Sequence, residues 1–162
     1  MASLGVHFAL TPDEERRLLA ARGDDAVQEI VKEEIEERWD EEWLCATDKA
    51  FDAIHRCLTN GTLVPDGSVL GKCILGGRSL HDGDEFLVRY LTAHEVKDVA
   101  RALGDVDERW LRPRFAALAS SDYEGPLDDD DFGYTLAHLT DLRDFFAAAA
   151  DAGRAVVFTV TQ

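Results

Sequence analysis

Two strand-to-helix junctions, each marked by a capping box, constrain the fold more than any other feature of the sequence. In GVHFALTPDEERRLL, a short strand from Gly5 to Leu10 leads into Thr11, and Glu14 follows three residues later. RYLTAHEVKDVARALGD repeats the pattern with Thr92 and Glu95. In such a box each of the two side chains accepts a hydrogen bond from the other residue's backbone N–H, which fixes a helix start. The chain therefore combines strands with helices, and one capping rule obeyed twice explains the similarity better than an ancient repeat does.

The remaining pattern predicts a single domain over residues 1–162, with about four short strands and five or six helices. Apolar residues at three- and four-residue steps indicate an amphipathic helix from Asp24 to Leu44, whose apolar stripe ends in Trp39 and Trp43. Thr47 is expected to cap the next helix. Further strands are expected over 68–75, 85–91 and 154–161, further helices over 93–103 and 134–150, and a shorter helix broken at Pro113. This order favours an α+β domain with a small mixed sheet, and an irregular three-layer α/β domain is the alternative.

The net charge of −16 is the strongest compositional signal, and it argues against two classes of partner. Affinity for nucleic acid comes mainly from cationic side chains that release condensed counterions, so we expect no nucleic acid partner. Anionic membrane surfaces are disfavoured for the same reason, and the longest apolar stretches are too short to cross a bilayer. The N-terminus lacks the cationic start and apolar run of a secretory signal, so a cytoplasmic location is expected.

Acidic residues crowd the polar face of the helix expected over 24–44. A strongly charged surface keeps a protein soluble, and this is the simpler explanation. The alternative is that this helix recognises a basic protein, because complementary charge steers association. The candidate partner-binding residues are Glu33, Glu34, Glu36, Glu37 and Glu41.

The stretch ILGGRSLHDGDEFLVRYLT, which begins at Ile74, contains two adjacent glycines, a histidine and several acids. A phosphate-binding loop would lead directly into a helix N-terminus, but the next helix start lies at Thr92. Asp82–Gly83 instead predicts a tight hairpin turn. The pair Gly76–Gly77 is typical of a bulge or of an edge where another backbone approaches closely.

Neither a metal site nor a cofactor is expected. Structural zinc sites usually pair their ligands two to four residues apart, whereas the three cysteines at 45, 57 and 73 are widely spaced. Their odd number also gives no disulfide framework. His81, Asp82 and Asp84 could ligate an ion, but neighbouring turn residues seldom supply three converging ligands.

His55 is the most informative single side chain. It lies four residues after Phe51 and three before Leu58, at the edge of the apolar stripe of its helix. Such a histidine is usually a structural residue whose nitrogens are satisfied by backbone groups or water. If it lines a pocket, it can act as a general base near neutral pH.

Several segments taken in order resemble the YfbM-like family, a bacterial domain family of unknown function. These segments are TDKAFDAIHRCLTNG, ILGG, VRYLTAHEVKDVARAL and FGYTLAHLTDLRDFFAAAADAGRAVVFTV. The resemblance implies a compact single domain and brings no known activity. The chain departs from the family pattern in its acidic segment EEIEERWDEEW and in the loop over 120–131. Where the pattern is most distinctive, it suggests a shared pocket formed by His55, Gly76, Gly77, Arg89 and Tyr90.

Three functions remain open at this stage. The favoured one is a non-catalytic binding module for a basic protein, with an immunity- or inhibitor-type role as one form of it. The second is a small hydrolase or transferase in which Arg89 orients an anionic substrate and His55 moves protons. The third is a structural homodimer, which exposed apolar residues on the Trp39–Trp43 stripe would support.

Overall fold

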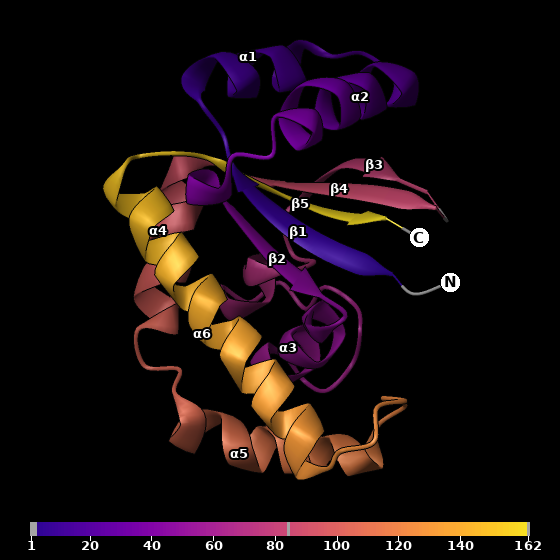
Figure 1. Ribbon diagram of the computed structural model, residues 1–162, viewed down its shortest axis with the longest axis vertical. Helices are drawn as coiled ribbons and strands as arrows, with labels where there is room; N and C mark the ends of the chain where they lie inside the picture. The colour runs from indigo at the N-terminus through magenta and orange to yellow at the C-terminus, as the bar shows by residue number, and fades with distance from the viewer. Residues whose placement is uncertain (1–2, 84, 162) are drawn as a thin grey trace.

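The computed structural model describes residues 3–83 and 85–161, and these form an antiparallel five-stranded sheet with helices on both of its faces (Figure 1). The strand order across the sheet is β2-β1-β5-β4-β3. The strands are β1 (Leu4–Ala9), β2 (Leu44–Asp48), β3 (Arg78–Asp82), β4 (Phe86–Leu91) and β5 (Val156–Thr161). The α-helices are α1 (Pro12–Ala20), α2 (Asp24–Ile30), α3 (Ala50–Leu58), α4 (Ala93–Leu103), α5 (Glu108–Ala117) and α6 (Asp129–Asp151). The antiparallel pairing confirms the α+β class, but the sheet is not mixed as predicted, and β2, which the sequence pattern did not indicate, brings the number of strands to five.

The sheet separates two apolar cores of unequal size. In Figure 1, α1 and α2 lie above the sheet, and α3 to α6 form the layer below it. Phe8, Val88 and Val157 face the smaller core, which also contains Leu18 of α1. Their sheet neighbours Ala9 and Phe158 point to the larger core, as alternation along a strand requires.

Both predicted capping boxes are confirmed. The Thr11 and Thr92 hydroxyls accept from the Glu14 and Glu95 backbone N–H groups at 3.1 and 3.2 Å. However, α1 packs into the smaller core and α4 into the larger one, so the helices that follow these strands cover opposite faces.

The helix predicted over 24–44 is confirmed as far as Arg38 and is wrong beyond it. After α2 the chain continues as a π-helix over Val31–Glu36, and Trp39 then adopts a left-handed φ of 42°. A 3-10 turn over Glu41–Trp43 follows, and Leu44 begins β2. Thr47 therefore lies in a strand instead of capping a helix, and its hydroxyl donates to the Gly5 carbonyl at 3.2 Å. Pairing with β1, which is remote in sequence, outweighs the local helical pattern.

The strand predicted over 68–75 is also wrong, whereas the hairpin that follows it is confirmed. Leu70–Cys73 form a 3-10 helix that packs on the larger core. Strand β3 pairs with β4 in antiparallel register, with Asp82 opposite Leu87. The Gly83 N–H donates to the Phe86 carbonyl at 3.0 Å, so Asp82 and Gly83 lie on the β3 side of the hairpin, whereas the prediction placed them at the centre of its turn. Asp84 lies outside the described residues.

The C-terminal third follows the prediction with two differences. Helix α5 continues through Pro113 without a break. Helix α6 begins before Tyr134, at Asp129, because the Asp128 carboxylate caps it and accepts from the Asp131 N–H at 2.8 Å. The acids that follow the cap occupy the first turn, where the helix dipole favours negative charge. Gly153 has a φ of 68° and ends the turn that leads to the closing strand.

His7 is buried at the centre of the larger core. Its ring contacts Phe145, Phe146 and Phe158, with centroids 4.5 to 6.0 Å apart. The Nε2 atom lies 2.6 Å from the Cys73 carbonyl oxygen, so Nε2 carries the proton and donates it. Burial lowers the pKa of His7 to about 4. The imidazole is therefore neutral at physiological pH.

We predict that acidification destabilises the protein through His7. Its pKa is lower in the folded state than its ordinary 6.5, so the unfolded chain binds the extra proton between pH 6.5 and 4, and stability falls as pH falls through that window. The expected contribution is about 2 kcal/mol between pH 7 and pH 5. Urea titrations of the wild type and of His7→Phe at both values measure it. The variant should be less stable at pH 7 but lose less on acidification, and an equal loss in both proteins would contradict the prediction.

Candidate functional site

The structure places His55 in the interior. Its side chain has 0% exposure, and its Nε2 atom donates to the Val64 carbonyl at 2.7 Å. Burial lowers the pKa of His55, although the bond to Val64 and the nearby Asp66 and Asp52 carboxylates act in the opposite direction. His55 is therefore excluded from solvent and hydrogen-bonded to a backbone carbonyl. This environment fits the structural role that the sequence left open, and not that of a general base in a pocket.

Arg89 and Tyr90 lie next to each other on β4 but point to opposite faces of the sheet. The Arg89 guanidinium lies 3.2 Å from the Ser79 hydroxyl and 3.6 Å from the Asp82 carboxylate. Tyr90 belongs to the smaller core, and its hydroxyl donates to the Glu15 carboxylate. Burial, with Glu15 beside the hydroxyl, raises the pKa of Tyr90. Neither side chain shares a hydrogen-bond partner with His55.

The glycine pair confirms the prediction of a close approach between backbones. A Cβ atom on Gly76 would lie 2.8 Å from the Gly71 backbone, and one on Gly77 would lie 2.8 Å from the Tyr90 carbonyl oxygen. Gly77 and Tyr90 are thus neighbours, as the candidate pocket requires. Both glycines nevertheless bring backbones together, which is a packing role.

The three cysteines are buried and reduced. Burial raises the pKa of the Cys45 and Cys57 thiols to about 12. Burial also raises the pKa of the Cys73 thiol well above its ordinary value. Thiols protonated at neutral pH are poor nucleophiles and poor metal ligands. Within residues 3–83 and 85–161, no group of three histidine, cysteine, aspartate or glutamate side chains is arranged to hold a metal ion.

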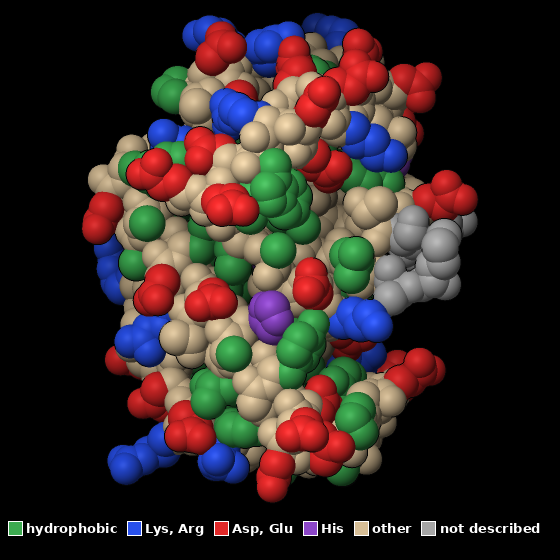
Figure 2. Space-filling view, viewed as in Figure 1, with side chains coloured by type: hydrophobic (Ala, Val, Ile, Leu, Met, Phe, Trp, Pro, Cys, Tyr) green, Lys and Arg blue, Asp and Glu red, His purple; other side chains and the backbone are tan. Residues whose placement is uncertain are grey.

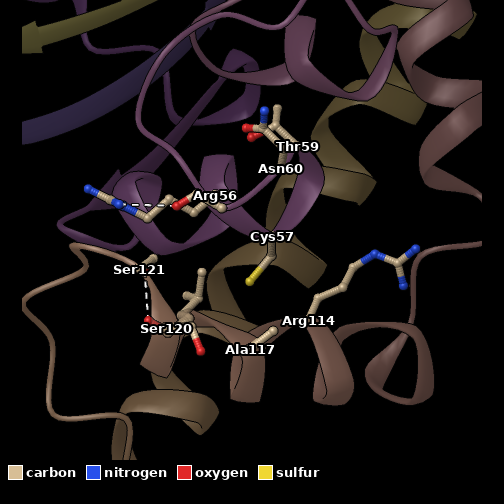
Figure 3. A pocket seen from close by; sticks show the side chains of 10 residues that line it. Arg56, Cys57, Thr59, Asn60, Arg114, Ala117, Ser120 and Ser121 are labelled. Carbon is tan, nitrogen blue, oxygen red and sulfur yellow. Dashed lines mark hydrogen bonds between the residues drawn. The ribbon is translucent and has the colours of Figure 1, made fainter.

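A buried arginine organises the end of α3. Arg56 is 5% exposed, and its guanidinium donates to Asp52 at 2.6 Å, to the Gly61 carbonyl at 3.2 Å and to Asp122. It borders a hollow of about 240 Å³ that Cys57, Arg114 and Ser121 also line (Figure 3). Because two carboxylates already neutralise it, Arg56 fastens the loop over 121–128 to α3 and is not available to bind an anion.

The predicted acidic residues do not form one continuous helical face. Glu34 pairs with Arg17 of α1. Glu36 is half-buried, and burial raises its pKa while the Lys32 charge opposes that rise. Glu33, Glu37 and Glu41 are exposed, and Glu41 lies in the 3-10 turn beyond the helix. Three of the five candidate residues therefore remain free to meet a partner.

The acidic surface continues beyond the segment predicted from sequence. A groove of about 380 Å³ runs between β2 and α6, and its lining includes three carboxylates and no lysine or arginine. Phe145 and Cys45, which both belong to the larger core, provide an apolar floor. Figure 2 shows acidic side chains spread over the face that carries α6, with apolar side chains gathered near its centre. The three carboxylates are Glu42, Asp141 and Asp144.

The apolar stripe predicted to end in Trp39 and Trp43 is not continuous. Trp39 is 44% exposed, and its indole packs edge-on against Phe8 with centroids 6.0 Å apart. Trp43 is partly buried against the larger core, and the Arg154 guanidinium stacks 3.7 Å above it. The helix ends before either tryptophan, so the two indoles lie over different cores.

Comparison with known proteins shows first a shared fold and then a family. The fold is similar to that of a solved structure of a protein of unknown function, YfbM from Escherichia coli, with a TM-score of 0.71, 15% identity and coverage of 98% of this chain and 99% of that one. The model of a family described as a domain of unknown function, DUF1877, matches residues 1–159. The chain belongs to this family, in agreement with the predicted resemblance to YfbM.

Two further comparisons give negative results. No curated protein matches the chain. Among the described residues, no helix is both long and apolar enough to cross a membrane.

We predict that the glycine pair is required for stability. Gly76→Ala and Gly77→Ala are each expected to lower the free energy of unfolding by about 1–3 kcal/mol, because each new Cβ would overlap backbone atoms. Gly133→Ala is the matched control, since a Cβ there meets nothing within 4 Å and the residue lies in α6. It should stabilise by about 0.5–1 kcal/mol. Urea titration measures all three, and three equal effects would contradict the prediction.

Proposed function

We propose that this protein is a non-catalytic interaction module of the cytoplasm that binds a basic partner protein in the groove between β2 and α6. One observation carries the proposal: Glu42, Asp141 and Asp144 border an apolar-floored groove whose lining residues include no cation. An apolar floor with a charged rim is the usual composition of a protein-binding surface. The negative charge of these three carboxylates favours basic partners.

The charge of the whole chain supports the same conclusion. With a net charge of −16, the protein attracts cationic proteins and repels nucleic acids and anionic membranes. Glu33, Glu37 and Glu41 add exposed carboxylates in the segment that precedes the groove residue Glu42 along the chain. These outer residues would mainly accelerate association, and the groove would provide the contacts that hold the partner.

An inhibitor- or immunity-type role is a narrower form of this proposal. It requires that the partner lose its own activity in the complex. The alternative of a hydrolase or transferase receives less support, because His55 is enclosed and the Arg89 guanidinium is occupied within the β3–β4 hairpin.

We expect that removing two groove charges weakens capture of the partner. Asp141→Asn combined with Asp144→Asn should reduce affinity several-fold, up to about thirtyfold, since each exposed ion pair contributes up to about 1 kcal/mol. The measurement is affinity capture of the tagged protein from its native lysate at low and high salt, with quantitative mass spectrometry of the retained proteins.

The matched control changes the same charge elsewhere. Glu29→Gln combined with Asp105→Asn alters two exposed acids outside the groove lining. A basic protein retained by the wild type and by this control, but not by the groove variant, supports the proposal. Equal retention by all three proteins, or equal loss from both variants, would show that the groove is not the binding surface.

A further inference from the structure

Strand β2 forms one edge of the sheet, and its outward backbone groups can be assigned from the register. The Leu10 N–H donates to the Ala155 carbonyl at 2.8 Å. Backbone groups of successive residues in a strand point to alternate sides, so Phe8 is directed to β5 and His7 to β2. His7 lies opposite Cys45, so Cys45 directs its N–H and C=O groups to β1. Leu44 and Ala46 therefore direct theirs away from the sheet.

This free edge opens directly into the acidic groove. Leu44 and Ala46 line it together with Asp141 and Asp144, which are exposed on α6. A ligand in the groove would thus meet unpaired peptide groups on one side and carboxylates on the other. Unpaired edge groups are the usual template for the addition of another strand.

Strand β3 forms the opposite edge of the sheet, and it packs against α2. His81 of β3 lies 2.9 Å from the Gln28 amide and 3.2 Å from the Asp24 carboxylate, and both partners belong to α2. Strand β3 is also interrupted by a register shift between Ser79 and His81. Strand β2 also has a register shift, opposite Gly5 and Val6, but its residues Leu44–Ala46 pair with β1 in continuous register. The sheet therefore offers a short regular edge over Leu44–Ala46, next to a charged groove.

We propose that the occupant of this edge is an extended basic segment of the partner, which adds to β2 as a sixth strand. Side chains alternate between the two faces of an extended segment, so lysines or arginines on one face would reach Asp141 and Asp144. Their aliphatic stems would cover Phe145. The inference rests on the proposed function and specifies how the partner binds.

A second copy of this chain fits the edge less well. Pairing two β2 edges would bring two acidic grooves together, and Glu42 lies just before the strand in each copy. Each chain also carries a net charge of −16. Like charges held opposite each other oppose association. A cationic segment converts the same carboxylates into attractive contacts.

The test uses a short acetylated and amidated peptide of alternating lysine and valine residues with a fluorescent label. One version is N-methylated at the lysines only and another at the valines only. Strand addition requires the N–H groups of one alternate set, so the two versions should differ in affinity by about tenfold or more. A one-residue shift cannot restore binding, because it would turn the lysines away from the groove. Fluorescence anisotropy gives the affinities.

Hydrogen exchange of the intact protein gives an independent result. The Leu44 and Ala46 amides should become protected when the unmethylated peptide binds, whereas the Cys45 amide is protected already. A difference between the N-methylated peptides together with this protection supports strand addition.

Three outcomes would overturn it. Equal affinity of both N-methylated peptides without protection, in binding that Asp141→Asn with Asp144→Asn still weakens, would leave an electrostatic groove and refute the added strand. Absence of binding by the lysine peptide would refute the groove as a site for basic segments, and the proposed function with it. Protection of both amides in the free protein, together with a dimer in sedimentation, would show a second copy on the edge.

Discussion

The pairing of β5 with both β1 and β4 is the interaction on which the rest of the structure depends. Strand β5 lies at the centre of the sheet and is buried along almost its whole length. Without it, the β2–β1 pair and the β4–β3 hairpin have no common neighbour. Both apolar cores also need it, because Val157 faces one and Phe158 the other. Contacts between residues so distant in sequence form slowly, since closing long loops costs conformational entropy.

The elements that were predicted correctly are mainly those that residues close together in the chain determine. The Thr11 and Thr92 caps were identified correctly because each depends on a few neighbouring residues. The Gly76–Gly77 pair was identified because only residues without a side chain permit such a close approach of another backbone. The errors fall where distant pairing decides. Strand β2 was missed since its sequence continues a helical pattern, and only β1 beside it makes an extended conformation favourable. The apolar run before Gly76 resembles a strand in its sequence. Among the described residues it pairs with no other strand, and Leu70–Cys73 form a 3-10 helix instead.

The candidate site was predictable only in part for the same reason. The sequence indicated an acidic surface and a basic partner, and Glu33, Glu37 and Glu41 are exposed as that expectation requires. It could not show that Glu42 lies beside Asp141 and Asp144, which are about a hundred positions away along the chain. The salt bridge between Arg56 and Asp122 was hidden likewise. Identifying such groupings requires knowing which helix covers which edge of the sheet.

The unequal cores imply an order in which the molecule opens. The layer of α1 and α2 covers its face of the sheet with short helices, and ion pairs from Arg17 to Glu34 and from Arg38 to Glu14 join α1 to the turns after α2. The other layer is anchored by the long helix α6 and several fully buried side chains. Because this layer covers the smaller of the two cores and part of its contact is through exposed ion pairs that salt screens, we expect it to detach before the larger core opens. The sheet and the larger core would then remain folded, so local unfolding of this protein would begin in the N-terminal layer.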